Sequence, residues 1–118
     1  MAGLTTHILD VTRGGPAEGV RIELYEFGAD GERKLVADVR TNPDGRTDKP
    51  LVPASDARIG RFELLFHAGD YFRRQGAKLA EPAFLDVIPL RFAVADPQAH
   101  YHVPLLVSPW SYSTYRGS

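Results

Sequence analysis

Short segments in which apolar and polar residues alternate run through most of the sequence. In VRIELYEF (20–27), for example, Val20, Ile22 and Leu24 alternate with charged residues, a period of two that turns one face of a strand toward a core. Turn signals separate such segments, including the Gly/Pro-rich stretch 12–19 and the Asp-Gly of NPDGR. Seven segments are predicted to be strands: 4–11, 20–27, 34–41, 61–68, 83–94, 101–108 and 111–117. Short strands at this spacing predict an all-β, two-sheet β-sandwich.

Three further features refine this architecture. Segment 47–60 contains two prolines and is predicted to be irregular with a short edge strand, which would be the eighth. Segment 69–80 does not alternate, and it predicts one short helix of about two to three turns. Pro89 lies inside the strand 83–94; because proline lacks the backbone donor that a ladder needs, this strand is expected at a sheet edge.

Length, charge and cysteine content limit the classes of protein to consider. The 118 residues suit a single domain, 1–118, and 43% of them are hydrophobic, enough for a core. A net charge of −1 gives no electrostatic reason to bind nucleic acid or an anionic membrane. The absence of cysteine excludes disulfides and thiolate metal sites. No apolar run approaches the roughly 20 residues that span a bilayer, and MAGLTTHILD does not resemble a signal peptide. We expect a cytoplasmic protein.

Two histidines lie on strand faces that are otherwise apolar. Alternation places His7 on one face with Leu9, and His102 on one face with Leu106. A single histidine of this kind is commonly a half-buried group satisfied by one hydrogen bond. Each of these strands has a second apolar face that can supply the core, so the two histidine faces are free to line a pocket or an intersubunit surface.

Two other polar patterns have both a functional and a structural interpretation. His100 and His102 are two residues apart on a strand, so both could bind one metal ion, with His7 as a third ligand. The sequence has no nearby carboxylate cluster and no cysteine to support that site, and we predict no metal. Arg46 follows Asp-Gly at a turn exit. It is either a solvated turn residue or a planar donor fork for a carbonyl or a developing oxyanion.

Several motifs together resemble one known family. THILD, GGPA, NPDGR, GDYF, HYHVPLL, SPWSYSTY and the terminal YRGS occur in this order along the chain. In this combination the sequence is similar to the 5-hydroxyisourate hydrolases, the transthyretin-related enzymes, over essentially all of residues 4–118. The hormone-carrying transthyretins share the sandwich and a similar SPxSYST segment, but they lack YRGS and the histidines.

The resemblance implies a transthyretin-like sandwich that pairs edge to edge into dimers, two of which stack into a homotetramer with the active sites in a channel between the dimers. It implies hydrolysis of 5-hydroxyisourate, the product of urate oxidation, to 2-oxo-4-hydroxy-4-carboxy-5-ureidoimidazoline, without cofactor or metal. The residues that match the family's motifs are His7, Arg46 and His102 as catalytic residues, and Tyr115, Arg116, Gly117 and Ser118 as substrate-binding residues. The two histidines would share the proton transfers, with their individual roles open.

Two other classes compete with a hydrolase. A transthyretin-like protein could hold a small aromatic ligand without turning it over, but the histidines and YRGS argue against that class. An immunoglobulin-like adhesion domain would share the sandwich, but the sequence shows neither a signal peptide nor a multidomain context.

Overall fold

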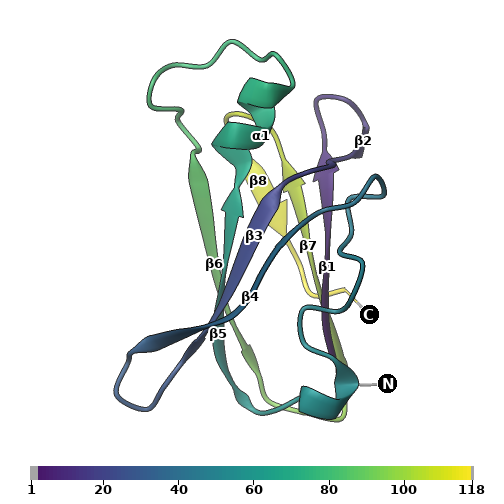
Figure 1. Ribbon diagram of the computed structural model, residues 1–118, viewed down its shortest axis with the longest axis vertical. Coiled ribbons are helices and arrows are strands. Elements are labelled where there is room, and N and C mark those ends of the chain that lie inside the picture. The colour runs from purple at the N-terminus through teal and green to yellow at the C-terminus, as the bar shows by residue number, and fades with distance from the viewer. Residues whose placement is uncertain (1–2, 118) are drawn as a thin grey trace.

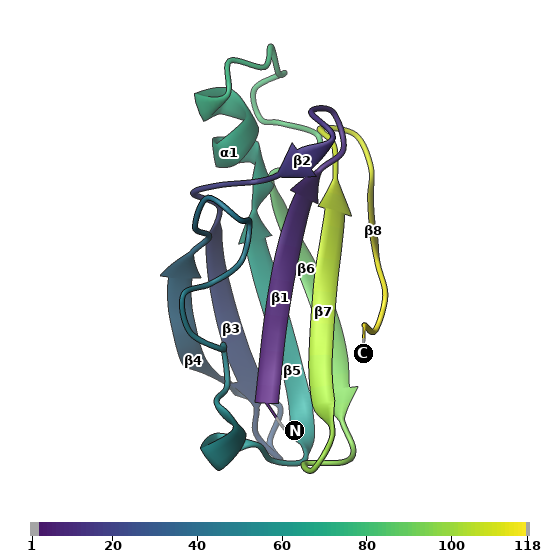
Figure 2. The same cartoon turned by 90° about the vertical axis from the view of Figure 1, so that its right-hand side faces the viewer.

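The chain forms two four-stranded sheets that pack face to face (Figures 1 and 2). The computed structural model describes residues 3–117. One sheet has the strand order β2-β1-β7-β8 and the other β4-β3-β5-β6. The elements, in chain order, are β1 Gly3–Asp10, β2 Gly15–Pro16, β3 Arg21–Phe27, β4 Arg33–Arg40, a 3₁₀ turn Ala54–Asp56, β5 Gly60–His67, α1 Ala68–Arg74, β6 Val87–Val94, β7 His100–Val107 and β8 Tyr112–Thr114. The predicted all-β sandwich is therefore confirmed.

Some boundaries differ from the sequence-based expectation. The eighth strand is β2, within the stretch predicted as a turn. Segment 47–60 has only a bridge between Leu4 and Val52 and the 3₁₀ turn before β5 begins at its last residue, Gly60. The prolines of that segment cannot donate to a ladder, which prevents a longer pairing there. The helix ends at Arg74, earlier than predicted. Gly76 just beyond it adopts φ +87°, and its amide bonds to the carbonyl of Arg73 at 3.0 Å, as in a glycine-terminated helix.

Strand β6 lies at the edge of its sheet, as Pro89 predicted. Pro89 stands opposite Leu65 of β5, its only neighbouring strand in the described sheet, so its missing N–H breaks no inner ladder. Figure 2 places β6 and β8 toward the same side of the sandwich. Both are terminal strands of their sheets within residues 3–117, which leaves two ladder edges open for pairing.

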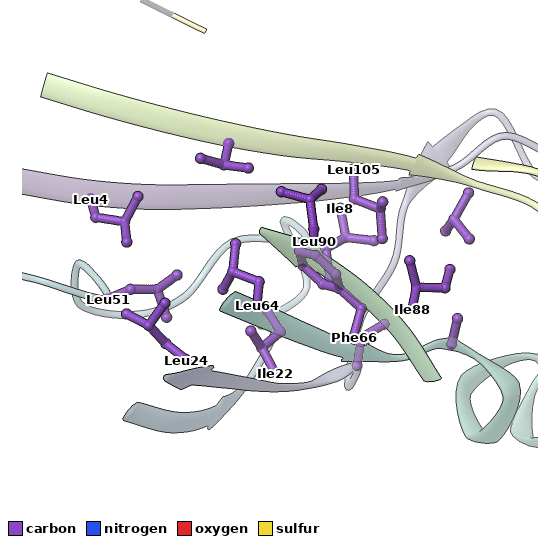
Figure 3. Packing of buried hydrophobic residues seen from close by; sticks show 14 of the residues in the cluster. Leu4, Ile8, Ile22, Leu24, Leu51, Leu64, Phe66, Ile88, Leu90 and Leu105 are labelled. Atoms are coloured by element: carbon purple, nitrogen blue, oxygen red, sulfur yellow. The ribbon is translucent and has the colours of Figure 1, made fainter. Parts of the chain in front are cut away.

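The core fills the space between the sheets (Figure 3). Ile22, Leu24, Leu64 and Phe66 of one sheet are all fully buried, as is Leu105 of the other. They occupy every second position of their strands, and this alternation produces the sandwich. The remaining positions of β1 and β7 face outward, which puts the two histidine-bearing faces on the outside of the β2-β1-β7-β8 sheet.

A buried hydrogen bond ties the helix to the end of β1. The Tyr71 hydroxyl donates to Asp10 Oδ2 at 2.8 Å, and both residues are buried. The other carboxylate oxygen accepts from the amide of Thr12 at 2.9 Å and from its hydroxyl at 2.5 Å. Asp10 is thus a strand-end hydrogen-bonding residue.

Replacing Tyr71 with phenylalanine is expected to lower the free energy of unfolding by about 1–3 kcal/mol, because it leaves one oxygen of the buried Asp10 carboxylate without its partner. Urea unfolding monitored by circular dichroism measures the change. Tyr25→Phe is the matched control, since the Tyr25 hydroxyl donates to Glu23 at only a partly buried position. An equal loss in both variants would contradict the special role of the Tyr71 bond.

Candidate active site

A tight turn places Arg46 beside His7. The Asn42 side chain accepts hydrogen bonds from the amides of Asp44 at 2.9 Å and Arg46 at 3.2 Å, and the Asn42 amide donates to the Arg46 carbonyl at 2.7 Å. These bonds close the NPDGR turn, and a β-bridge then pairs Arg46 with His7 of β1. The bridge therefore holds the Arg46 backbone beside that of His7, a predicted catalytic histidine, and the Arg46 charge is close enough to lower the pKa of His7.

Gly45 is required for this arrangement. Its φ is +73°, and a Cβ there would lie 2.5 Å from the Ile8 carbonyl oxygen. The Gly45 carbonyl accepts from the Ile8 amide at 2.8 Å. Only a residue without a side chain lets the turn approach β1 this closely.

Parallel pairing of β1 with β7 brings His102 to the same surface. In this register Thr5 lies opposite His102, and His7 lies opposite Pro104. The Thr5 hydroxyl is 2.8 Å from His102 Nδ1 and 3.1 Å from Nε2 of His100. Two segments almost a hundred residues apart thus supply neighbouring side chains.

The C-terminal tail lies against His102. The Gly117 amide donates to the His102 carbonyl at 2.7 Å, and a Cβ on Gly117 would lie 2.8 Å from Cδ2 of the imidazole. This close approach explains why glycine suits that position of YRGS. Ser118 lies outside the described residues.

A groove of about 450 Å³ opens on this face. Its walls come from three segments: Thr5 and Thr6 of β1, residues 46–50 after the turn, and His100 and His102 of β7. The volume suits a small polar ring compound. Its lining combines imidazole, guanidinium, hydroxyl and ammonium groups, which can donate hydrogen bonds to substrate oxygen atoms, with the carboxylate of Asp48, which can accept them.

Burial and the neighbouring guanidinium favour the neutral form of both predicted catalytic histidines. Burial is the largest cause that lowers the pKa of His7, followed by the charge of Arg46, while a hydrogen bond with the Asp44 backbone acts in the opposite direction. The pKa of His102 is also lowered, first by burial, then by Arg46, His100 and His7. Neutral imidazoles at pH 7 can accept a proton from water.

If the reaction uses neutral imidazoles, these shifts fix the pH dependence of kcat/KM. Because the folded-state pKa values of His7 and His102 are lowered, activity should persist below the ordinary histidine pKa of about 6.5. It should fall only as the pH drops through the lowered values. A pH–rate profile measures this, and an acidic limb at or above 6.5 would contradict it.

The described structure separates the predicted site residues into two places. His7, Arg46 and His102 converge on one face, and Gly117 contacts His102. Tyr115 and Arg116 instead line a second cavity of about 240 Å³ between β6 and the tail. There the Arg116 guanidinium lies 4.2 Å from the centroid of the Tyr101 ring.

Sequence reasoning missed Thr5 and considered His100 only as a metal ligand. Both line the groove. Thr5 carries no local signal, because its role depends on the pairing of β1 with β7. Residues 3–117 contain no group of three or more histidine, aspartate or glutamate side chains arranged to hold a metal ion. Nor is any helix in this part of the chain long and apolar enough to cross a membrane.

The two-sheet sandwich places the chain among transthyretin-like proteins. The crystal structure of transthyretin from Sparus aurata superposes with a TM-score of 0.87 at 27% identity, over 99% of this chain and 97% of that one. Residues 4–117 match the HIUase/Transthyretin family, and the chain belongs to that family.

Within this family, the chain is more similar in sequence to enzymes than to the transthyretin. The 5-hydroxyisourate hydrolase 2 of Rhizobium meliloti is 56% identical over 115 residues, which cover 98% of this chain and 95% of the relative. The crystal structure of an (S)-allantoin synthase superposes with a TM-score of 0.91 at 46% identity. That match covers 98% of this chain, which spans 43% of the synthase. The identity to the hydrolase is thus twice the identity to the transthyretin.

Proposed function

We propose that this protein hydrolyses 5-hydroxyisourate to 2-oxo-4-hydroxy-4-carboxy-5-ureidoimidazoline, a step of urate degradation. The observation that carries the proposal is that His7, Arg46 and His102 come from three remote segments to one face of the sheet. Arg46 and His102 line the groove there, in a chain 56% identical to a named 5-hydroxyisourate hydrolase. The enzyme is a cyclic amide hydrolase. Its reaction is a hydrolysis without a redox step, so the proposal needs no redox cofactor, and it assigns water activation to imidazole and not to a metal.

The chemistry follows from the charges that develop in the groove. A water oxygen attacks a ring carbonyl carbon, the C–N bond of the cyclic amide breaks, and the water proton is transferred to the departing nitrogen. A neutral imidazole takes that proton and returns it. The Arg46 guanidinium anchors the substrate oxygens and stabilises the negative charge that the carbonyl oxygen gains. His7 and His102 share these tasks.

The C-terminal tail completes the substrate-binding wall in this proposal. Gly117 contacts His102 directly. Tyr115 and Arg116 are proposed to contribute after assembly into a homotetramer, a dimer of dimers whose channel contains the active sites. The open edges of β6 and β8, together with the exposure of Trp110 (67%) and Val11 (51%), support assembly through surfaces that a single chain leaves uncovered. A cytoplasmic location is part of the same proposal, consistent with a sequence without cysteine.

Turnover of freshly generated 5-hydroxyisourate, followed by ultraviolet absorbance, tests the function. The intact protein should accelerate its decay, and a chain that lacks residues 115–118 should be slower by on the order of 10²-fold, because the substrate loses a positioning wall. Analytical ultracentrifugation of both proteins gives their oligomeric states. It shows whether the slower turnover comes from the missing part of the binding site or from failure to form a tetramer. Binding without accelerated decay would instead identify a small-ligand carrier, and full activity of the shortened chain would exclude the tail from the site.

A further inference from the structure

One hydroxyl group connects the two histidines of β7. Thr5 Oγ1 lies 2.8 Å from His102 Nδ1 and 3.1 Å from His100 Nε2. The two rings are nearly parallel, inclined by 12°, with centroids 6.5 Å apart. The parallel register of β1 and β7 creates this geometry, because it places Thr5 directly opposite His102.

The hydrogens available to these three groups restrict how they can bond. A threonine hydroxyl has one hydrogen to donate and lone pairs to accept, and a neutral imidazole has one N–H and one bare nitrogen. Thr5 can therefore donate to only one of the two rings. The other ring must bring its own N–H to the Thr5 oxygen.

The second ring nitrogen of His100, Nδ1, decides which of the two rings receives the hydrogen bond from Thr5. His100 Nδ1 is buried and has no hydrogen-bond partner among residues 3–117. A buried N–H without an acceptor is rarer in folded proteins than a buried acceptor without a donor. The proton of His100 therefore belongs on Nε2, from which it donates to Thr5. The Thr5 hydroxyl then has its own hydrogen free for His102 Nδ1.

We propose that Thr5 and His100 are positioning residues that hold His102 as the tautomer protonated at Nε2. His102 then donates a hydrogen bond from Nε2 to the substrate oxygen that gains charge, as a neutral electrophile, and keeps its proton throughout. His7 is the base: it takes the proton of the attacking water and passes it to the departing nitrogen.

The surroundings of His7 fit this division of tasks. Burial and the charge of Arg46 lower the pKa of the ring, while the Asp44 backbone acts in the opposite direction. A neutral imidazole has one bare nitrogen, which can accept a water proton. The charged and titratable groups that act on His102 are Arg46, His100 and His7, and each of them favours its neutral form.

The tautomer can be measured without substrate. Long-range ¹⁵N–¹H correlation spectra of the intact, ¹⁵N-labelled protein, recorded above the histidine titrations, should show His102 and His100 both protonated at Nε2. A His102 protonated at Nδ1 would overturn the inference. The role of His102 as a donor depends on the proposed function, but this measurement does not, so failure of turnover and failure of the tautomer assignment remain distinct.

Thr5→Val and Thr5→Ser test the positioning role. Thr5→Val should lower kcat by about 10- to 100-fold, an effect no larger than that of removing an oxyanion donor outright. Its KM should stay within about twofold of the wild-type value. Thr5→Ser should restore most of kcat, because it keeps the hydroxyl. A Thr5→Val variant that loses only thermal stability, with kcat and KM unchanged, would overturn the inference.

The pKa of His102 changes with a sign that a purely structural role would not produce. A hydroxyl that donates to Nδ1 stabilises neutral His102, so its loss in Thr5→Val should raise the pKa of His102, measured from its ring ¹⁵N shifts as the pH is lowered. A hydroxyl that accepts from Nδ1–H would stabilise the cation, and its loss would lower that pKa, against the inference. Thr41→Val is the matched control: its hydroxyl donates to the Ala17 carbonyl at 2.6 Å at a buried position that does not line the groove, and its loss should leave the His102 tautomer unchanged.

Discussion

Replacing His7 with glutamine is expected to lower kcat for 5-hydroxyisourate by about 10²- to 10⁴-fold, the usual contribution of a general base. Glutamine has a polar amide in place of the imidazole, but it has no nitrogen that accepts a proton near neutral pH. KM should change little, because the substrate oxygens are held mainly by Arg46 and His102. Stopped-flow measurement of hydroxyisourate decay at saturating substrate gives kcat and KM separately.

His67→Gln is the matched control for this experiment. His67 lies on the outer face of the other sheet, where its Nε2 is 2.7 Å from the Glu23 carboxylate, whereas His7 lies on the sheet that carries the groove. The control should retain wild-type kcat. A His7→Gln variant with wild-type kcat would exclude His7 as the base and contradict the division of tasks between the two histidines.

Replacing Arg46 with alanine should cost about 2–4 kcal/mol of transition-state stabilisation, or roughly 10²- to 10³-fold in kcat/KM, if the guanidinium stabilises the developing oxyanion. Arg46→Lys should recover part of this loss, because lysine keeps the charge but not the planar fork of donors. The loss should appear in kcat as well as in KM, since the charge on the oxygen is greatest in the transition state.

The same substitution should also move the pH profile. Arg46 lowers the pKa of both His7 and His102 through its charge. Its removal raises both pKa values, so the acidic limb should shift toward higher pH in Arg46→Ala and much less in Arg46→Lys. Arg40→Ala is the control, because among residues 3–117 the exposed Arg40 side chain hydrogen-bonds only to the Gly19 carbonyl, at 3.2 Å. Unchanged kinetics and an unchanged limb in Arg46→Ala would remove Arg46 from the site.

Most of the fold could be predicted because strand formation has a local signature. The alternation at 20–27 and 61–68 identified strands and assigned the core face that Ile22, Leu24 and Phe66 now occupy. Pro89 alone identified an edge strand, because it has no backbone N–H to donate to a neighbouring strand. The helix was placed but made too long, because the residues after Gly76 do not alternate and resemble a helix continuation.

The candidate site was only partly predictable. His7 and His102 could be assigned to outward faces from their strands alone, and the buried alternate positions Ile8, Val103 and Leu105 agree with that assignment. Arg46 could not be assigned from its turn, which is equally compatible with a solvated side chain. The resemblance carried by the motifs selected it, and the structure shows the cause: Gly45 packs against β1 and brings the next residue to His7.

By itself the sequence determined the elements, their faces and their turns, because these depend on hydrogen bonding and burial within a few residues. Tertiary structure alone decided which faces meet. The parallel pairing of β1 with β7 sets the Thr5 hydroxyl between His100 and His102, and no local pattern specifies a register between strands that far apart. The physical reason is that this register results from burying both inner faces in one core, a condition that only the whole chain satisfies.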